Sequence, residues 1–196
     1  MGFISQQMGD NKCGAYSIAY WEWIKIKSLN PSGYVLDKSS KADQIHCVNQ
    51  IYNQIKFDPL VSGELGLNEE FSDPKKMIDY LRESDEIQQK GTILYNKNQK
   101  LEDAFGSYLG DDYRENVSGN KLPDLNVGDF AILILLDDES KLPQHYVLVM
   151  KDESGKVKVI DPGVGDWDTE AWDDVESVNI SGFINSGAAI YIKNII

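Results

Sequence analysis

A lone cysteine near the start of the chain lies where a thiol becomes reactive. Cys13 follows the turn-forming residues Gly9, Asp10 and Asn11 and precedes a long apolar segment, so we expect it at the N-terminus of a buried helix. Unpaired backbone N–H groups and the helix dipole stabilise a thiolate there, and the thiolate is the nucleophilic form of cysteine. Six residues upstream, Gln7 carries an amide that would join the Cys13 N–H in donating to a developing oxyanion.

Packing is the alternative interpretation, because free cysteine is among the most buried residue types. Catalysis needs a base, and the second half of the chain contains one. His145 precedes one apolar run of strand length, Asp161 ends the next, and the turn sequence 152–155 between the runs predicts a hairpin. The hairpin would place His145 beside Asp161. A carboxylate on one ring nitrogen fixes the imidazole tautomer, so that the other nitrogen exchanges a proton with a thiol. The three residues therefore predict a Cys-His-Asp triad.

The elements around these residues change character along the chain. Apolar periodicity predicts helices in the first half and short apolar runs predict strands in the second. The expected helices cover 13–27, 41–55, a segment from Ser72-Asp73-Pro74 onward and 98–109, with a loop over 57–70 and a short strand over 92–95. A polar connector over 110–128 leads to strands over 130–136, 146–150, 157–160 and 188–192. We therefore expect one α+β domain, with a helical lobe over about 1–110 and an antiparallel β lobe over about 111–196.

These residues, in this order, resemble the papain-like cysteine peptidases over the whole chain. Gln7 lies six residues before Cys13, Gly14 follows the cysteine, and His145 comes 132 residues later, within the interval typical of that superfamily. The strand pair H-Y-V-L-V-M and V-K-V-I-D-P-G looks most like bacterial peptidases similar to those that process double-glycine leaders of bacteriocins, or papain-like bacterial effectors. Asp161 stands where the plant and lysosomal enzymes carry Asn, and the chain lacks their disulfides, so it falls outside that inner group.

The resemblance implies a papain-like fold and a role for each matched residue. Gln7 would be the oxyanion donor, Cys13 the nucleophile, His145 the general base and acid, and Asp161 the orienting residue. The implied reaction is hydrolysis of a peptide or amide bond through a thioester, with no cofactor. Glutamine deamidation, transglutamination or another acyl transfer is an alternative with the same chemistry, and a catalytically silent binding module is an alternative of another class.

The sequence gives weaker evidence for substrate contacts and for metal sites. We expect Gly14 and Trp167 to contact substrate, with Trp172 as a further wall of the groove, although packing between the lobes explains the two tryptophans equally well. A metal site at His46 and Cys47 is not expected, because helix neighbours point about 100° apart. The calcium-like series Asp166, Asp168 and Glu170 lacks the glycine at the sixth position and the glutamate at the twelfth, so we interpret it as an acidic loop.

Composition narrows the class of partner. The 196-residue chain has a net charge of −13, which argues against nucleic acid and anionic membranes as partners and favours a neutral or basic protein or peptide substrate. Two cysteines are too few for a disulfide scaffold, so a reducing compartment is expected. With neither a signal peptide nor an apolar run long enough to span a bilayer, we expect a cytoplasmic protein or one delivered by a signal-peptide-independent route. The sequence leaves the oligomeric state open.

Overall fold

A computed structural model describes residues 3–7, 10–29, 40–65, 70–83, 92–96, 108–116 and 121–192. Four helices come first: α1 (Cys13–Leu29), α2 (Lys41–Ile55), α3 (Pro59–Leu65) and α4 (Pro74–Glu83). The strands are β1 (Ile93–Asn96), β2 (Arg114–Asn116), β3 (Phe130–Asp137), β4 (Pro143–Lys151), β5 (Val157–Asp161), β6 (Asp166–Trp167) and β7 (Phe183–Ile192). Two single-turn 3₁₀ helices, η2 (Asp111–Tyr113) and η3 (Val175–Ser177), lie between strands.

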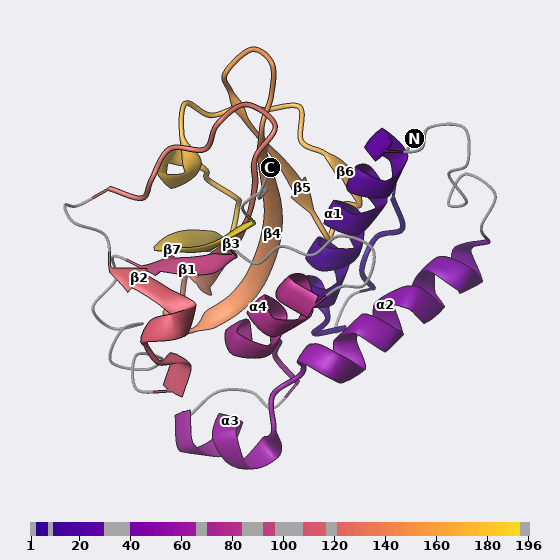
Figure 1. Cartoon of the computed structure of the whole chain (residues 1–196), viewed down its shortest axis with the longest axis vertical. Helices are drawn as coiled ribbons and strands as arrows, with labels where there is room; N and C mark the ends of the chain where they lie inside the picture. The colour runs from indigo at the N-terminus through magenta and orange to yellow at the C-terminus, as the bar shows by residue number, and fades with distance from the viewer. Residues whose placement is uncertain are drawn as a thin grey trace.

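The seven strands form one sheet, in the order β2-β1-β7-β3-β4-β5-β6. Every neighbouring pair is antiparallel except β1 with β2. Figure 1 shows α1, α2 and α4 grouped beside the sheet, and α1 packs directly on β4 and β3. The α+β class predicted from the sequence is confirmed: N-terminal helices pack against a mostly antiparallel sheet. None of the described helices is long and apolar enough to cross a bilayer.

Both faces of the sheet are buried, which explains why β3 reads as a continuous apolar run. One face packs on the helices: Ile132, Tyr146 and Leu148 lie in the same core as Ile18 and Trp21 of α1. The opposite face, which includes Leu133, Val147 and Val159, is covered by loop residues such as Leu122 and Val175. The sheet therefore fixes the direction of each side chain strongly, because a one-residue slip would exchange the two cores.

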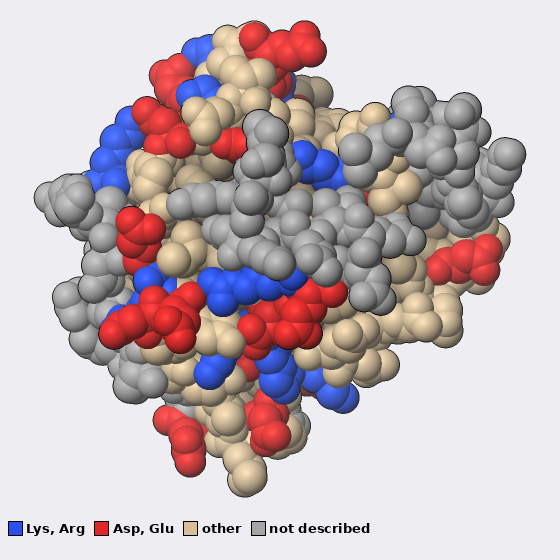
Figure 2. Space-filling view, viewed as in Figure 1, with Lys and Arg blue, Asp and Glu red and all other residues tan. Residues whose placement is uncertain are grey.

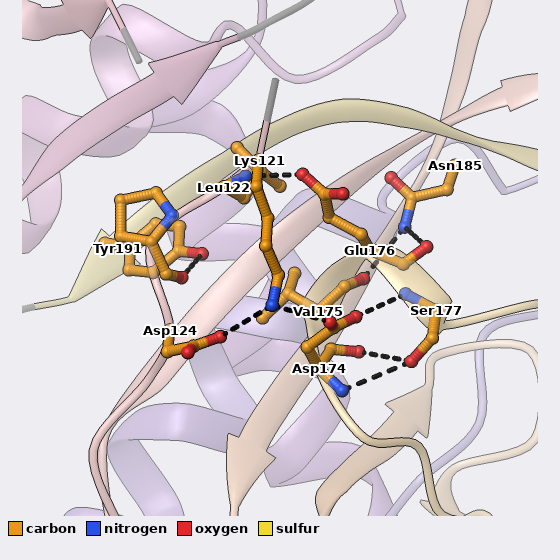
Figure 3. Close-up of polar contacts among 10 residues, drawn as sticks. Lys121, Leu122, Asp124, Asp174, Val175, Glu176, Ser177, Asn185 and Tyr191 are labelled. Carbon is orange, nitrogen blue, oxygen red and sulfur yellow. Dashed lines mark hydrogen bonds and ion pairs between the residues drawn. The ribbon is translucent and has the colours of Figure 1, made fainter. Parts of the chain in front are cut away.

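Polar contacts hold the loop layer in place (Figure 3). Lys121 Nζ lies 3.0 Å from Asp174 Oδ2 and 3.4 Å from Asp124 Oδ1. The Asn185 amide of β7 donates to the Val175 carbonyl at 2.8 Å. These contacts tie the segment before β3 and the segment before β7 to each other and to the sheet.

Several predicted boundaries hold and some do not. The helix over 41–55 is confirmed at both ends. A capping box formed by Ser40 and Asp43 begins it. The predicted loop over 57–70 contains α3 instead, with Pro59 at its first position and the Asp58 carboxylate accepting from the Leu60 N–H. The connector over 110–128 contains η2 and β2, and the last strand begins at Phe183 instead of residue 188. Most of the predicted helix over 98–109 lies outside the described residues.

Candidate active site

The thiol of Cys13 lies at the first residue of α1, against the start of β4. Its side chain is almost fully buried, at 2% exposure, and its Sγ lies 4.0 Å from the carbonyl oxygen of Gln144. The thiol also lies close enough to the His145 ring to raise the pKa of the imidazole. Deeper in the interface, Ser17 Oγ donates to the Tyr146 carbonyl at 3.3 Å and holds the helix against the strand. The end of α1 that favours a thiolate is thus directed at an imidazole.

The imidazole of His145 is held on three sides. Its Nε2 lies 2.8 Å from Asp161 Oδ1, which leaves Nδ1 for the thiol. The ring stacks on Phe183, with centroids 4.7 Å apart and planes 23° from parallel. Burial alone would lower the pKa of His145, but Asp161 and Cys13 outweigh it and raise the pKa to about 9. The charged imidazolium form of His145 is therefore favoured over a wide pH range.

Irregular strand pairing on both sides of Leu135 in β3 sets the direction of the groups around the thiol and the imidazole. On one side Leu135 pairs with His145 and the next residue pairs with Pro143, so Gln144 is an extra residue in β4. On the other side Leu135 pairs with Asn185, so Ser186 and Gly187 are extra in β7. The bulge in β4 places the Gln144 carbonyl beside the thiol, and the bulge in β7 follows shortly after the strand start that carries Phe183. Bulges of this kind re-aim side chains next to active sites.

Asp161 ends β5 and begins a tight turn. Its Oδ1 accepts from the Gly163 N–H at 2.7 Å, and its carbonyl accepts from the Gly165 N–H at 2.8 Å. Burial alone would raise the pKa of Asp161, but the hydrogen bond and charge of His145 and the Gly163 N–H hold it below the ordinary value. Asp161 is therefore an ionised, fixed acceptor for the imidazole.

The same turn holds the N-terminal segment 3–7. The Gln6 N–H donates to the Pro162 carbonyl at 2.7 Å, and Tyr20 Oη donates to the Ile4 carbonyl at 2.6 Å. Gly165 has φ +75°, and a Cβ there would lie 2.8 Å from the Phe3 carbonyl oxygen. Glycine is required at this position both for its backbone angle and for the close approach of the two segments.

The structure brings Cys13, His145 and Asp161 together as the sequence predicts, whereas no hydrogen bond of the described structure joins the Gln7 side chain to them. Gln7 is exposed and lines a hollow of about 390 Å³ between the N-terminal segment, α1 and α2. The other residues that line this hollow are Ser5, Asp10, Lys12, Tyr16, Lys41, Ile45 and Asn49. Its neighbour Gln6 is more buried, and its Oε1 has no hydrogen-bond partner in the described part of the chain.

The predicted substrate contacts have packing roles in the structure. A Cβ on Gly14 would lie 2.5 Å from Ser72 Oγ, so this glycine lets the start of α4 approach α1. Trp167 is half-buried and packs against the core under the helices, whereas Trp172 packs on the other face of the sheet. The two tryptophans therefore do not form one groove wall.

The metal interpretation gains no support. Among the described residues, no three His, Cys, Asp or Glu side chains are grouped closely enough to hold a metal ion. His46 is exposed and Cys47 is half-buried. Burial and the nearby Glu22 carboxylate raise the pKa of the Cys47 thiol, which keeps it protonated.

Gln144 and Phe183, which contact the thiol and the imidazole, were not among the predicted site residues. Bulged strands leave no signal in the sequence, so neither residue was predictable. In comparisons with known proteins, no family model matches the chain and no curated protein matches it significantly by sequence.

Proposed function

We propose that this protein is a papain-like thiol hydrolase that cleaves peptide or amide bonds. The observation that carries the proposal is the Cys13–His145–Asp161 series: a thiol at a helix N-terminus, an imidazole beside it, and a carboxylate 2.8 Å from the far ring nitrogen. Thiol, base and orienting acid in this arrangement are the parts of nucleophilic acyl transfer. The order of these residues in the chain agrees with the papain-like resemblance.

The reaction proceeds in two balanced steps. The Cys13 thiolate attacks the carbonyl carbon, a C–S bond forms, and the carbonyl π pair moves to the oxygen. When this intermediate collapses, the C–N bond breaks and His145 gives its proton to the leaving amine, so a thioester remains. His145 then takes a proton from water as the water oxygen bonds to the thioester carbon. When this second intermediate collapses, the C–S bond breaks, which releases a carboxylic acid and returns the thiolate–imidazolium pair.

Other outcomes share the first step. An amine in place of water gives a transferase, and a glutamine side chain as acyl donor gives a deamidase. Mass spectrometry of the product separates these outcomes, because cleavage yields new termini and deamidation shifts the mass by about one dalton. The proposal favours a protein or peptide substrate and needs no cofactor.

The test compares the two thiols of the chain. Exposure alone predicts that half-buried Cys47 reacts before Cys13, which is 2% exposed. The proposal predicts the opposite order with iodoacetamide at about pH 6, because only Cys13 has an imidazolium to stabilise its thiolate. Peptide mass mapping over time measures both rates. His145→Ala should slow the labelling of Cys13 and leave that of Cys47 unchanged.

Acylation supplies the second readout. p-Nitrophenyl acetate should give a burst of one nitrophenolate per chain and an acetyl group on Cys13, absent from Cys13→Ala. Faster labelling of Cys47 in the folded protein, or no burst, would overturn the enzyme assignment and leave the binding-module alternative.

A further inference from the structure

The hollow between the N-terminal segment, α1 and α2 lies against the helix end that carries the thiol. Its volume of about 390 Å³ is within the range of ligand sites. Two of its lining residues flank Cys13 in the chain: Lys12 directly precedes it, and Tyr16 follows three residues later in α1. Residues three apart on a helix have their Cβ atoms about 5–6 Å apart. The hollow therefore begins within one helical turn of Cys13.

Tyr16 supplies the hollow with a hydrogen-bond donor that has no partner. The residue is 3% exposed, and its ring packs edge-on against that of Tyr20. The Tyr20 hydroxyl donates to the Ile4 carbonyl, whereas the Tyr16 hydroxyl makes no hydrogen bond within the described part of the chain. Burial and the Asp10 carboxylate, which lines the same hollow, raise the pKa of Tyr16, so the hydroxyl keeps its proton. An acceptor that enters the hollow would satisfy this donor.

The charges around the hollow leave one cation over. Lys12 Nζ lies 2.9 Å from Asp10 Oδ1, so these two charges neutralise each other. Lys41, the first residue of α2, is exposed and forms no ion pair with any residue that the structure describes. The nearby Asp43 carboxylate accepts from the Ser40 N–H and hydroxyl instead. With two lysines and one aspartate, the lining carries a net charge of +1 on a chain of −13.

We propose, building on the proposed function, that this hollow binds a carboxylate of the substrate, so that the hydrolase cleaves peptides with Asp or Glu close to the scissile bond. The carboxylate would accept from the Tyr16 hydroxyl and pair with Lys41, and the Asn49 amide lines the same space. An extended peptide advances about 3.3 Å per residue, so an acidic side chain within about three residues of the bond would reach the hollow. The net charge of the chain favours a neutral or basic substrate, whereas the local charge of the hollow favours an acidic group at this position.

Reversible binding tests the hollow without any turnover. The probes are acetyl-Gly-Glu-amide, acetyl-Gly-Gln-amide and acetyl-Gly-Lys-amide, which differ in one side chain, and the protein carries Cys13→Ala. In a ligand-observed NMR titration, the glutamate peptide should bind about tenfold more tightly than the glutamine peptide, because hydrogen bonds to a charged acceptor are the stronger ones. The lysine peptide should bind most weakly.

Three further variants locate that preference. Tyr16→Phe should remove most of the tenfold difference, because it deletes only the hydroxyl. Lys41→Gln should reduce the difference about twofold to fivefold, as expected for an exposed ion pair. Lys56→Gln is the matched control, because Lys56 is an exposed lysine just past the other end of α2, and it should keep the full preference.

Alkylation connects the hollow to the thiol. Iodoacetyl-Gly-Glu-amide and iodoacetyl-Gly-Gln-amide carry the same two tails on one reactive group. With native Cys13, the glutamate reagent should alkylate this thiol about tenfold faster at low concentration, as measured by peptide mass mapping. Tyr16→Phe should lose this difference and keep the wild-type rate with plain iodoacetamide, which an unfolded or distorted site would not. Cys47 of the same molecule should show no preference for the glutamate reagent.

The possible outcomes are distinguishable. Equal binding of the glutamate and glutamine peptides, tightest binding of the lysine peptide, or a preference that survives in both Tyr16→Phe and Lys41→Gln would overturn the carboxylate site. A preference in binding without one in alkylation of Cys13 would overturn its role in substrate recognition. Failure of the proposed function is a separate result: Cys13 would react no faster than Cys47 with iodoacetamide, while the reversible preference for the glutamate peptide would persist.

Discussion

His145 receives a different kind of neighbour on each side of its ring. Asp161 lies at Nε2, the Cys13 thiol is the partner of the other edge, and Phe183 covers one face. The raised pKa and the fixed orientation therefore have the same source. Loss of either polar neighbour should be visible in the titration of the ring before any change in the fold.

Titration of His145 gives a direct prediction. The chain has two histidines, so a His46→Gln variant leaves one imidazole to follow by NMR. Its pKa should be about 9, above the ordinary 6.5. Asp161→Asn should lower it, because the amide oxygen still accepts from the ring but carries no charge, and Asp161→Ala should lower it further. The acylation rate should follow the same order.

The sign of the linked stability follows from the raised pKa. The folded state binds the His145 proton more tightly than the unfolded chain, so this stabilisation is complete below about pH 6.5 and is lost as the pH rises through about 9. Alkylation of Cys13 removes one of the groups that raise the pKa and should shift the loss to lower pH. An unchanged titration in both Asp161 variants and after alkylation would contradict the described contacts.

Residue identities were the most predictable part of the site. Cys13, His145 and Asp161 were found because a turn sequence before an apolar helix and a hairpin between two apolar runs constrain position strongly. Gln7 was selected by spacing alone, and spacing does not say which way a side chain in an irregular segment points. The exposed position of Gln7 and the enclosed one of Gln6 result from contacts with a turn more than 150 residues away in the chain.

Among the elements, the turn after β5 has the most influence on the site. It positions Asp161, anchors Gln6 and accommodates the N-terminal segment at Gly165. Helices were predictable where caps and apolar periodicity coincide, as in α2, and α3 was missed because Gly63 and Gly66 indicated a loop. The bulges around Leu135 were not predictable, because they depend on pairing between strands distant in sequence.

Gly165→Ala tests the turn. Alanine at φ +75° is strained, and its Cβ would displace the Phe3 backbone. Gly155→Ala is the matched control, because Gly155 has φ +78° and no atom lies within 4 Å of the added Cβ. Both variants should lose about 1–2 kcal/mol from backbone strain. Gly165→Ala should lose clearly more and also acylate more slowly, as measured by denaturant midpoint and nitrophenolate burst. Equal losses would show that the turn does not constrain the N-terminal segment.

At the scale of the molecule, the predicted boundary near residue 110 between a helical lobe and a β lobe does not separate the helices from the sheet. β1, from the first half, lies between β2 and β7 in the sheet (Figure 1). On the face shown in Figure 2, acidic side chains form several separate groups with Lys and Arg between them, so the net charge of −13 is not gathered into one patch there.

We expect the helices and the sheet to unfold in a single transition. In a variant with Trp167 and Trp172 replaced by Phe, the remaining Trp21 and Trp23 report on the helical layer, while far-ultraviolet circular dichroism reports on the backbone as a whole. The two signals should give the same midpoint in denaturant, because α1 and the sheet share one core. Separate midpoints would mean that the helices and the sheet unfold independently.

The contact between the N-terminal segment and the turn at Pro162–Gly165 has a consequence for synthesis. A ribosome delivers Cys13 first, Asp161 and its turn much later, and Phe183 near the end of the chain. Closing such a long-range contact is among the slow steps of folding. During translation the nascent chain therefore carries its thiol without base, acid or stacking ring, and under the proposed function it gains activity only when the last strands have joined the sheet.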